Sequence, residues 1–131
     1  KTSSAVRLIH TPSGVSVSES EDRSQVRNRS NALKKLRLRI AMTVRCKIDE
    51  VCPGADPFYV PSVHNIHAYA PWLAVLVDHL AFDGWDVRRT AERYGISSSR
   101  LIKIIFRDSG LWQELNRKRA AAGLAPLKGI K

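Results

Sequence analysis

The chain has 131 residues, enough for one domain or two small ones with a modest core. Lys and Arg number 22 against 12 Asp and Glu, a formal net charge of +10, which indicates a polyanionic partner such as nucleic acid. No apolar run approaches the ~20 residues that span a bilayer, and no secretory or transit segment is visible, so we expect a soluble chain with no membrane partner.

The charge is unevenly distributed along the chain. Residues 1–48 carry 11 basic and 3 acidic side chains, and residues 68–131 carry 11 basic and 6 acidic ones. Residues 49–67 carry three acidic and no basic side chains, and Pro53, Gly54, Pro57 and Pro61 cluster there. This pattern predicts an N-terminal module over 1–48, a Pro-rich linker over 49–68 and a helical module over 69–131. Cys46 and Cys52 lack a second pair, so we expect reduced thiols and no zinc site.

The first module begins with an expected β-hairpin. Residues Ser4–His10 alternate apolar and polar and are rich in strand-forming types, and Val15–Ser18 alternates in the same way. Thr11–Gly14 contains the Pro and Gly of a turn. His10 at the strand end is interpreted as structural. Because two strands are marginal alone, a helix or further strands should cover one face.

A basic helix is predicted to follow, with Ser24 as its N-cap and Glu21 and Asp22 near its positive end. Apolar residues recur at helical spacing at Val26, Ala32, Leu33, Leu36, Ile40 and Met42 or Val44. The other faces contain Arg27, Lys34, Lys35, Arg37, Arg39 and Arg45. Two interpretations stay open: a solvated polar face, or a face that binds an RNA backbone, which the scarcity of acidic neighbours favours.

Three segments of this module carry a family resemblance: Lys1–His10 (KTSSAVRLIH), the Pro12-Ser13-Gly14 turn, and Arg23–Asn28 (RSQVRN). They resemble the peptidyl-tRNA hydrolysis domain of class I peptide chain release factors. The resemblance implies a catalytic Gly-Gly-Gln loop a few residues before Lys1, and leaves open that a homologue has lost this motif. It also implies that Lys1, Thr2 and Ser3 lie at the exit of that loop, and that Arg23, Gln25, Arg27 and Asn28 lie against ribosomal RNA near the peptidyl transferase centre.

The last module is predicted to be wholly helical. Pro71 should open a broadly apolar helix that Gly84 ends. Three further helices are expected: Val87–Tyr94, capped by Asp86 and ended by Gly95; Ser98–Arg107, capped by Ser97; and Leu111–Ala122, capped by Ser109 and stopped by Gly123 and Pro126. Trp72, Trp85 and Trp112 are interpreted as core residues rather than base-stacking ones.

The middle two of these helices resemble a helix-turn-helix, with Ala91 at the helix contact, Gly95 in the turn, and Leu101 and Ile104 packing back. A DNA reader would present Ser98, Ser99, Arg100, Lys103 and Arg107. The alternative is a small helical bundle that uses the same turn for packing or RNA contact. The basic run Arg117-Lys118-Arg119 is interpreted as a phosphate contact.

Together these features predict an α+β protein: a small hairpin-and-helix domain, a linker and a helical bundle. It resembles stand-alone release-factor-like proteins without a codon-recognition domain, which implies ribosome binding, large subunit favoured, and codon-independent peptidyl-tRNA hydrolysis if Gly-Gly-Gln lies upstream. The implied partners are the ribosome, ribosomal RNA and peptidyl-tRNA, in a bacterial cytoplasm, mitochondrion or plastid. The alternatives are a non-catalytic organellar large-subunit protein or assembly factor, and a DNA-binding regulator. An mRNA-binding adaptor that has left the ribosome is a third alternative.

The sequence predicts no catalytic residue within the chain, and no metal, cofactor or small-molecule substrate. The residues predicted to contact RNA are Lys1, Arg7, Arg23, Gln25, Arg27, Asn28, Arg29, Lys34, Lys35, Arg37, Arg39, Arg100, Lys103, Arg107, Arg117, Lys118 and Arg119.

Overall fold

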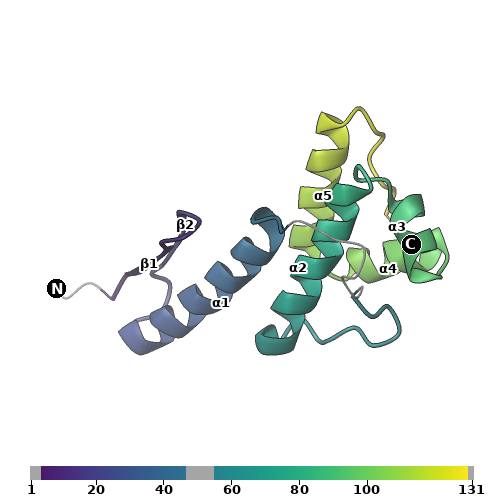
Figure 1. Cartoon of the computed structure of the whole chain (residues 1–131). Coiled ribbons are helices and arrows are strands. Elements are labelled where there is room, and N and C mark those ends of the chain that lie inside the picture. Colours follow the sequence, from purple (N-terminus) through teal and green to yellow (C-terminus); the bar gives the residue numbers. More distant parts are fainter. Residues whose placement is uncertain (1–3, 47–54, 130–131) are drawn as a thin grey trace.

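The computed structural model describes residues 4–46 and 55–129. Strands β1 (Val6–His10) and β2 (Val15–Glu19) are followed by helices α1 (Gln25–Thr43), α2 (Ile66–Phe82), α3 (Val87–Tyr94), α4 (Ser98–Phe106) and α5 (Ser109–Ala121). Figure 1 shows the hairpin lying along α1 at one end of the molecule and helices α2–α5 gathered at the other. The predicted α+β class is confirmed.

The hairpin forms where the alternation predicted it. β1 and β2 are antiparallel, with Leu8 opposite Val17 and His10 opposite Val15 beside the turn. Gly14 has a φ of +76°, a conformation that costs a residue with a Cβ, and its amide donates to the His10 carbonyl at 2.8 Å. The sheet contains these two strands within the described residues, so its inner face depends on α1 for burial.

Two apolar clusters of unequal size stabilise the fold. The smaller one joins Val17 of β2 to Ala32 and Leu36 of α1. The larger one is built around Leu73, Leu76 and Leu80 of α2, with buried residues from the other helices. Ala41, near the end of α1, belongs to this larger cluster. Helix α1 therefore packs against the hairpin through the side that carries Ala32 and Leu36, and it joins the larger cluster through Ala41 near its C-terminal end (Figure 1).

The structure corrects the predicted start of the second helix. Helix α2 begins at Ile66, so Pro71 lies inside the helix and not in its first turn. A proline inside a helix lacks the N–H for the carbonyl four residues earlier, which disfavours this arrangement locally. Burial of Ile66, Tyr69 and Ala70 in the larger cluster accounts for the longer helix, because the preceding turns also bury apolar surface.

The remaining helices follow the predicted capping pattern with one difference. Ser24, Asp86 and Ser97 each accept a backbone N–H as predicted N-caps, and Gly95 ends α3 in the left-handed conformation. Helix α5 is capped by Asp108, not by Ser109. The three tryptophans pack partly buried against the larger cluster. No helix in the described ranges is long and apolar enough to cross a membrane.

Candidate nucleic-acid interface

A buried amide fixes the N-terminal end of α1. The side chain of Asn28 is fully buried; its Nδ2 donates to the carbonyls of Ser4 (2.7 Å) and Asp22 (2.8 Å), and its Oδ1 accepts from the Asp22 amide at 3.0 Å. These bonds join the segment before β1 and the loop before α1 to the first turn of the helix. Asn28 therefore positions its neighbours and offers no surface to a ligand, although the sequence placed it among the contact residues.

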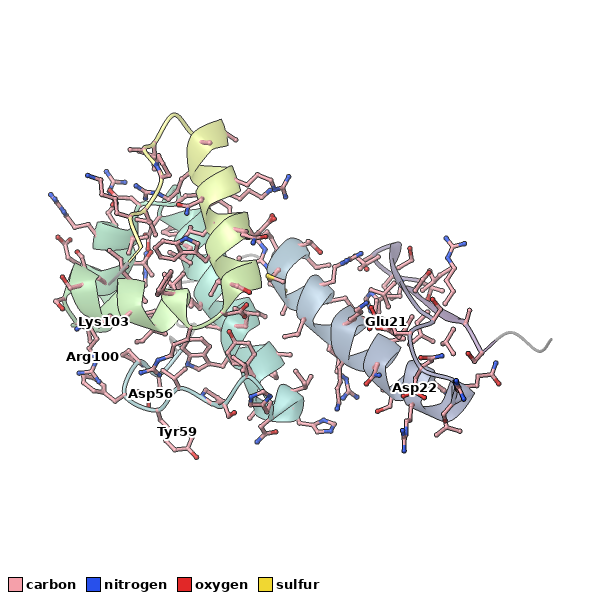
Figure 2. The ribbon with its side chains drawn as sticks, turned by 180° about the vertical axis from the view of Figure 1, so that it is seen from behind. Glu21, Asp22, Asp56, Tyr59, Arg100 and Lys103 are labelled. Atoms are coloured by element: carbon pink, nitrogen blue, oxygen red, sulfur yellow. The ribbon has the colours of Figure 1, made fainter. Side chains whose placement is uncertain are left out.

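Exposed cations surround this end of α1. Arg23, Arg27 and Arg29 are exposed, as is Gln25. The nearest carboxylate, that of Asp22, lies 3.7 Å from the Arg27 guanidinium, an exposed pair of the kind that contributes little to stability. Figure 2 shows Asp22 and Glu21 at the opposite end of the molecule from Arg100 and Lys103. We call Arg23, Arg27 and Arg29 the α1 basic tip; exposed Arg7 of β1 and Lys34 of α1 lie elsewhere on this module.

The other basic residues of α1 do not form a single face. Lys35 donates to the Glu19 carboxylate at 2.9 Å and Arg39 to the Ser16 carbonyl at 3.3 Å, so both bind the hairpin. Arg37 instead lies 3.2 Å from the His67 ring nitrogen, on the side of α2. The Lys35 hydrogen bond lowers the pKa of Glu19 below its ordinary value. The predicted RNA-binding face of this helix is thus divided between two sides.

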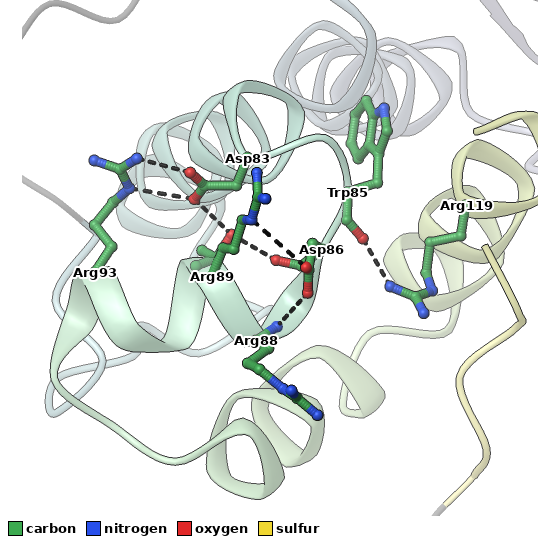
Figure 3. Close-up of polar contacts among 8 residues, drawn as sticks. Asp83, Trp85, Asp86, Arg88, Arg89, Arg93 and Arg119 are labelled. Carbon is green, nitrogen blue, oxygen red and sulfur yellow. Dashed lines mark hydrogen bonds and ion pairs between the residues drawn. The ribbon is translucent and has the colours of Figure 1, made fainter. Parts of the chain in front are cut away.

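An ion pair joins α2 to α3 in the helical module. Figure 3 shows the Asp83 carboxylate facing the Arg93 guanidinium, at 2.7 and 3.2 Å, and Thr90 donates to Asp83 at 2.9 Å. Burial of Asp83 opposes its ionisation, but the hydrogen bonds from Arg93 and Thr90 outweigh burial and lower its pKa. Arg93 is thereby a structural residue of the helix-turn-helix-like unit.

The basic run of α5 has partners within the protein. Arg117 pairs with Glu114 at 2.6 Å, and the Lys118 ammonium lies 5.8 Å from the centre of the Trp85 ring. Arg119 donates to the carbonyls of Trp85 (2.7 Å, Figure 3) and Ala125 (2.9 Å). Trp85 has a φ of +67°, an uncommon value for a residue other than glycine, and the Arg119 bond stabilises that turn. Phosphate contact by this run stays a prediction.

Three cations lie on one side of helix α4 and its C-cap: Arg100 and Lys103 belong to the helix, and Arg107 is the C-cap. Arg100, Lys103 and Arg107 are exposed and take part in no ion pair among the described residues. The Arg100 guanidinium lies 4.6 Å from the centre of the Phe58 ring. Phe58 and its neighbour Tyr59 are 68% and 77% exposed, and sequence reasoning placed both in the linker and assigned them no role. An adjacent aromatic pair between Pro57 and Pro61 was the signal that could have found them.

Two buried titratable side chains, Tyr69 and His79, have polar partners within the core. Tyr69 donates to the Asp108 carboxylate at 2.6 Å, and burial together with this bond raises the pKa of its hydroxyl. The His79 ring lies 2.7 Å from the Tyr94 hydroxyl, and burial lowers its pKa. His10 lies 2.6 Å from the Ser13 hydroxyl in the hairpin turn, in keeping with the structural role expected of it. No metal-binding cluster occurs in the part of the chain that the structure describes. Lys1 lies outside that part.

Comparison with known proteins finds a family match for the N-terminal part of the chain, which contains the hairpin and α1. Residues 1–51 match the family described as the RF-1 domain. Over 40 residues the chain is 52% identical to peptide chain release factor 1 of Leptospira biflexa and 55% identical to that of Lysinibacillus sphaericus. The N-terminal module is class I release-factor-like. The resemblance noted from the sequence is thereby confirmed.

The release-factor-like module is a small part of such relatives. Each release factor 1 match covers 30% of this chain and 11% of the relative. A match to peptide chain release factor 2 of Campylobacter concisus is 35% identical over 69 residues, 53% of this chain and 19% of the relative. No solved structure matches the chain. The hairpin, the Asn28 network, the α1 basic tip and all of α1 lie within the matched residues 1–51, whereas α2–α5 lie beyond them.

Proposed function

We propose that this chain binds the ribosome as a release-factor-like protein of translation. The observation that carries the proposal is the RF-1 domain match over residues 1–51, on a module whose cations at the α1 basic tip are exposed. A net charge of +10 supports a nucleic-acid partner, and ribosomal RNA is the one that release factor relatives suggest. Contact with the large subunit and with peptidyl-tRNA is part of the proposal, and the compartment stays a prediction.

Catalysis is proposed only conditionally. The 131 residues contain no Gly-Gly-Gln, so none of them is assigned to ester hydrolysis. With that motif ahead of Lys1, the module would bring it to peptidyl-tRNA, and the protein would act in codon-independent release. Without it, the same RNA-binding module would serve a non-catalytic ribosomal protein or assembly factor. Both versions require the same ribosome contact, which is therefore what the first experiment measures.

The experiment is co-sedimentation of the purified protein with 70S-type ribosomes and with each isolated subunit, over a range of salt concentrations. The triple variant Arg23→Gln, Arg27→Gln, Arg29→Gln removes three exposed charges from the α1 basic tip. We expect it to weaken binding by about tenfold or more, and to reduce the salt dependence. The control triple, Arg88→Gln, Arg89→Gln, Lys128→Gln, removes equal charge from exposed residues of the other module and should change affinity by less than about threefold.

Two outcomes would contradict the proposal. One is absence of ribosome binding at low salt, and the other is an equal loss of affinity in both triple variants, which would indicate nonspecific charge attraction. Tighter binding to the small subunit than to the large one would refute the subunit assignment alone.

A further inference from the structure

A recess lies between the loop at residues 57–60 and helix α4. It has a volume of about 330 Å³ and is lined by Pro57, Phe58, Tyr59, Val60, Arg100, Lys103, Ile104 and Arg107. A second recess of about 300 Å³ adjoins it and shares Val60, Ile104 and Arg107 with it. Volumes of this size are typical of small-ligand pockets. Neither belongs to the release-factor-like module.

The first recess is positively charged. Arg100, Lys103 and the C-cap Arg107, which keeps helical dihedral angles, follow one another at spacings of three and four, which places them on the same side of α4 and its C-terminal end. Among the residues that the structure describes, no acidic side chain lines the recess. Asp56, at the start of the loop, uses its carboxylate to accept the Phe58 amide at 2.9 Å. Three cations that pair with no carboxylate of residues 4–46 and 55–129 favour an anionic ligand.

Aromatic rings stand next to these charges. Tyr59 is 77% exposed, and Figure 2 shows its side chain pointing outward beside Asp56, near Arg100 and Lys103. The Phe58 ring lies against the Arg100 guanidinium and thus restricts the conformations of the Arg100 side chain. An exposed ring beside a row of cations is the combination that binds single strands: a base stacks on the ring and phosphates approach the cations.

The loop is attached to the helical core. The Trp72 indole donates to the Asp56 carbonyl at 3.1 Å, and Ala55 is 4% exposed. The Tyr59 ring therefore projects from an anchored turn, which reduces the conformational entropy lost when a ligand binds.

The same loop argues against a duplex in this position. In a helix-turn-helix DNA reader the exposed side of the second helix enters the major groove. Here three of the five residues that would enter it, Arg100, Lys103 and Arg107, line a recess together with the loop 57–60, so another chain segment lies beside them. An unpaired strand can enter a recess of this kind, whereas a double helix requires the whole helix side to be open.

We propose that this recess binds unpaired nucleotides of an RNA strand, with a base stacked on Tyr59 and phosphates on Arg100, Lys103 and Arg107. The geometry assigns an unpaired strand, and the choice of RNA over DNA rests on the proposed function. This second site lies on residues that the release-factor-like match over residues 1–51 does not include. It would give the helical module a role in nucleic-acid binding separate from the α1 basic tip.

The test is fluorescence anisotropy with a labelled ten-nucleotide oligouridine, the matching oligothymidine, and duplex RNA and duplex DNA of equal length. Oligouridine should bind more tightly than either duplex. Tyr59→Ala should weaken its binding by about tenfold, and Tyr59→Phe, which keeps the ring, by less than about twofold. The triple Arg100→Gln, Lys103→Gln, Arg107→Gln should reduce the slope of log affinity against log salt by about 2, and Arg88→Gln, Arg89→Gln, Lys128→Gln by clearly less.

Several results would overturn the assignment. Equal affinity of Tyr59→Ala and the wild type refutes base stacking, and tighter binding of either duplex refutes an unpaired ligand. Tighter binding of oligothymidine than of oligouridine refutes RNA. Because Tyr59 is exposed, its variants should keep the wild-type circular dichroism spectrum. The variant of the α1 basic tip should keep oligouridine affinity within about threefold, so failure here and failure of ribosome binding are distinguishable.

Discussion

Asp83 and Asn28 show how buried polar side chains join neighbouring segments in the two halves of the molecule. Asp83 is 8% exposed and lies at the end of α2, where it binds Thr90 and Arg93 of α3. Asn28 is fully buried and joins the start of the described chain to α1. In both cases removal of one partner would leave a buried polar group without a hydrogen bond. The free-energy cost of such an unpaired group is larger than the net stabilisation that the hydrogen bond provides.

The Asp83 pair predicts a pH dependence of stability. The pKa of Asp83 is lower in the folded protein than its unfolded value of about 3.9. The pair therefore stabilises the fold at pH values above about 4, and this contribution is lost as pH falls through the lower, folded pKa. Asp83→Asn should reduce the free energy of unfolding at pH 7 by about 1–2 kcal/mol, less than the ~3–5 kcal/mol of a fully buried pair, because Arg93 is 35% exposed.

Urea unfolding of the wild type and of Asp83→Asn between pH 7 and pH 2 measures the difference in their free energies of unfolding. It should narrow as pH falls below about 4, because the wild-type carboxyl then becomes protonated. The exposed carboxylate of Glu92, in α3 next to Arg93, provides the control, and Glu92→Gln should change stability by less than about 0.5 kcal/mol. A difference between wild type and Asp83→Asn that stays constant down to pH 2 would contradict the assigned role.

At the scale of whole elements, two glycines near helix ends should respond in opposite ways to substitution by alanine. Gly95 ends α3 with a φ of +68°, and no atom lies within 4 Å of an added Cβ, so backbone conformation alone opposes substitution. Gly95→Ala should therefore destabilise the protein by about 1 kcal/mol. Gly110 has an ordinary φ in the first turn of α5, and an added Cβ would meet the Asp108 carboxylate at 3.4 Å, which is van der Waals contact. Gly110→Ala should stabilise by about 0.5 kcal/mol. Thermal unfolding of both variants measures the two changes, and equal signs would contradict this interpretation.

The elements also show what local sequence can predict. The N-caps Ser24, Asp86 and Ser97 could be predicted from the sequence, because each accepts a hydrogen bond from an amide only two or three residues further along the chain. The start of α2 could not be predicted in this way, because it depends on the burial of Ile66 and its neighbours against other helices.

The candidate sites likewise combine features that local sequence predicts with features that only tertiary packing determines. The basic residues could be named from the sequence, but their partners could not. Lys35 binds Glu19, 16 residues away, and Arg37 approaches His67, 30 residues away. Tyr59 was missed because its loop meets α4, some 40 residues further along the chain, and only tertiary packing brings the two together.

At the scale of the whole molecule, α1 links two clusters that differ in size. The hairpin cluster has three buried residues, Val17, Ala32 and Leu36, whereas the larger cluster includes fifteen. A two-stranded hairpin is marginal by itself, so its stability depends on the side of α1 that carries Ala32 and Leu36. The end of α1 packs with α2 and shares the stability of the larger cluster. The release-factor-like hairpin should therefore open locally more often than the helical module unfolds.

Hydrogen exchange tests this difference directly. Amides of β1 and β2 should exchange faster than those of α2 and α5 in the wild-type protein, because local opening exposes them without global unfolding. Leu36→Ala removes a buried side chain from the hairpin cluster, at a cost of about 2 kcal/mol, and should accelerate strand exchange by about 30-fold while α2 amides keep their protection. Leu73→Ala, the matched change in the larger cluster, should instead lower the protection of α2–α5. Equal acceleration of all elements by Leu36→Ala would show that α1 couples the two clusters into one cooperative unit, and the hairpin would then have no local opening of its own.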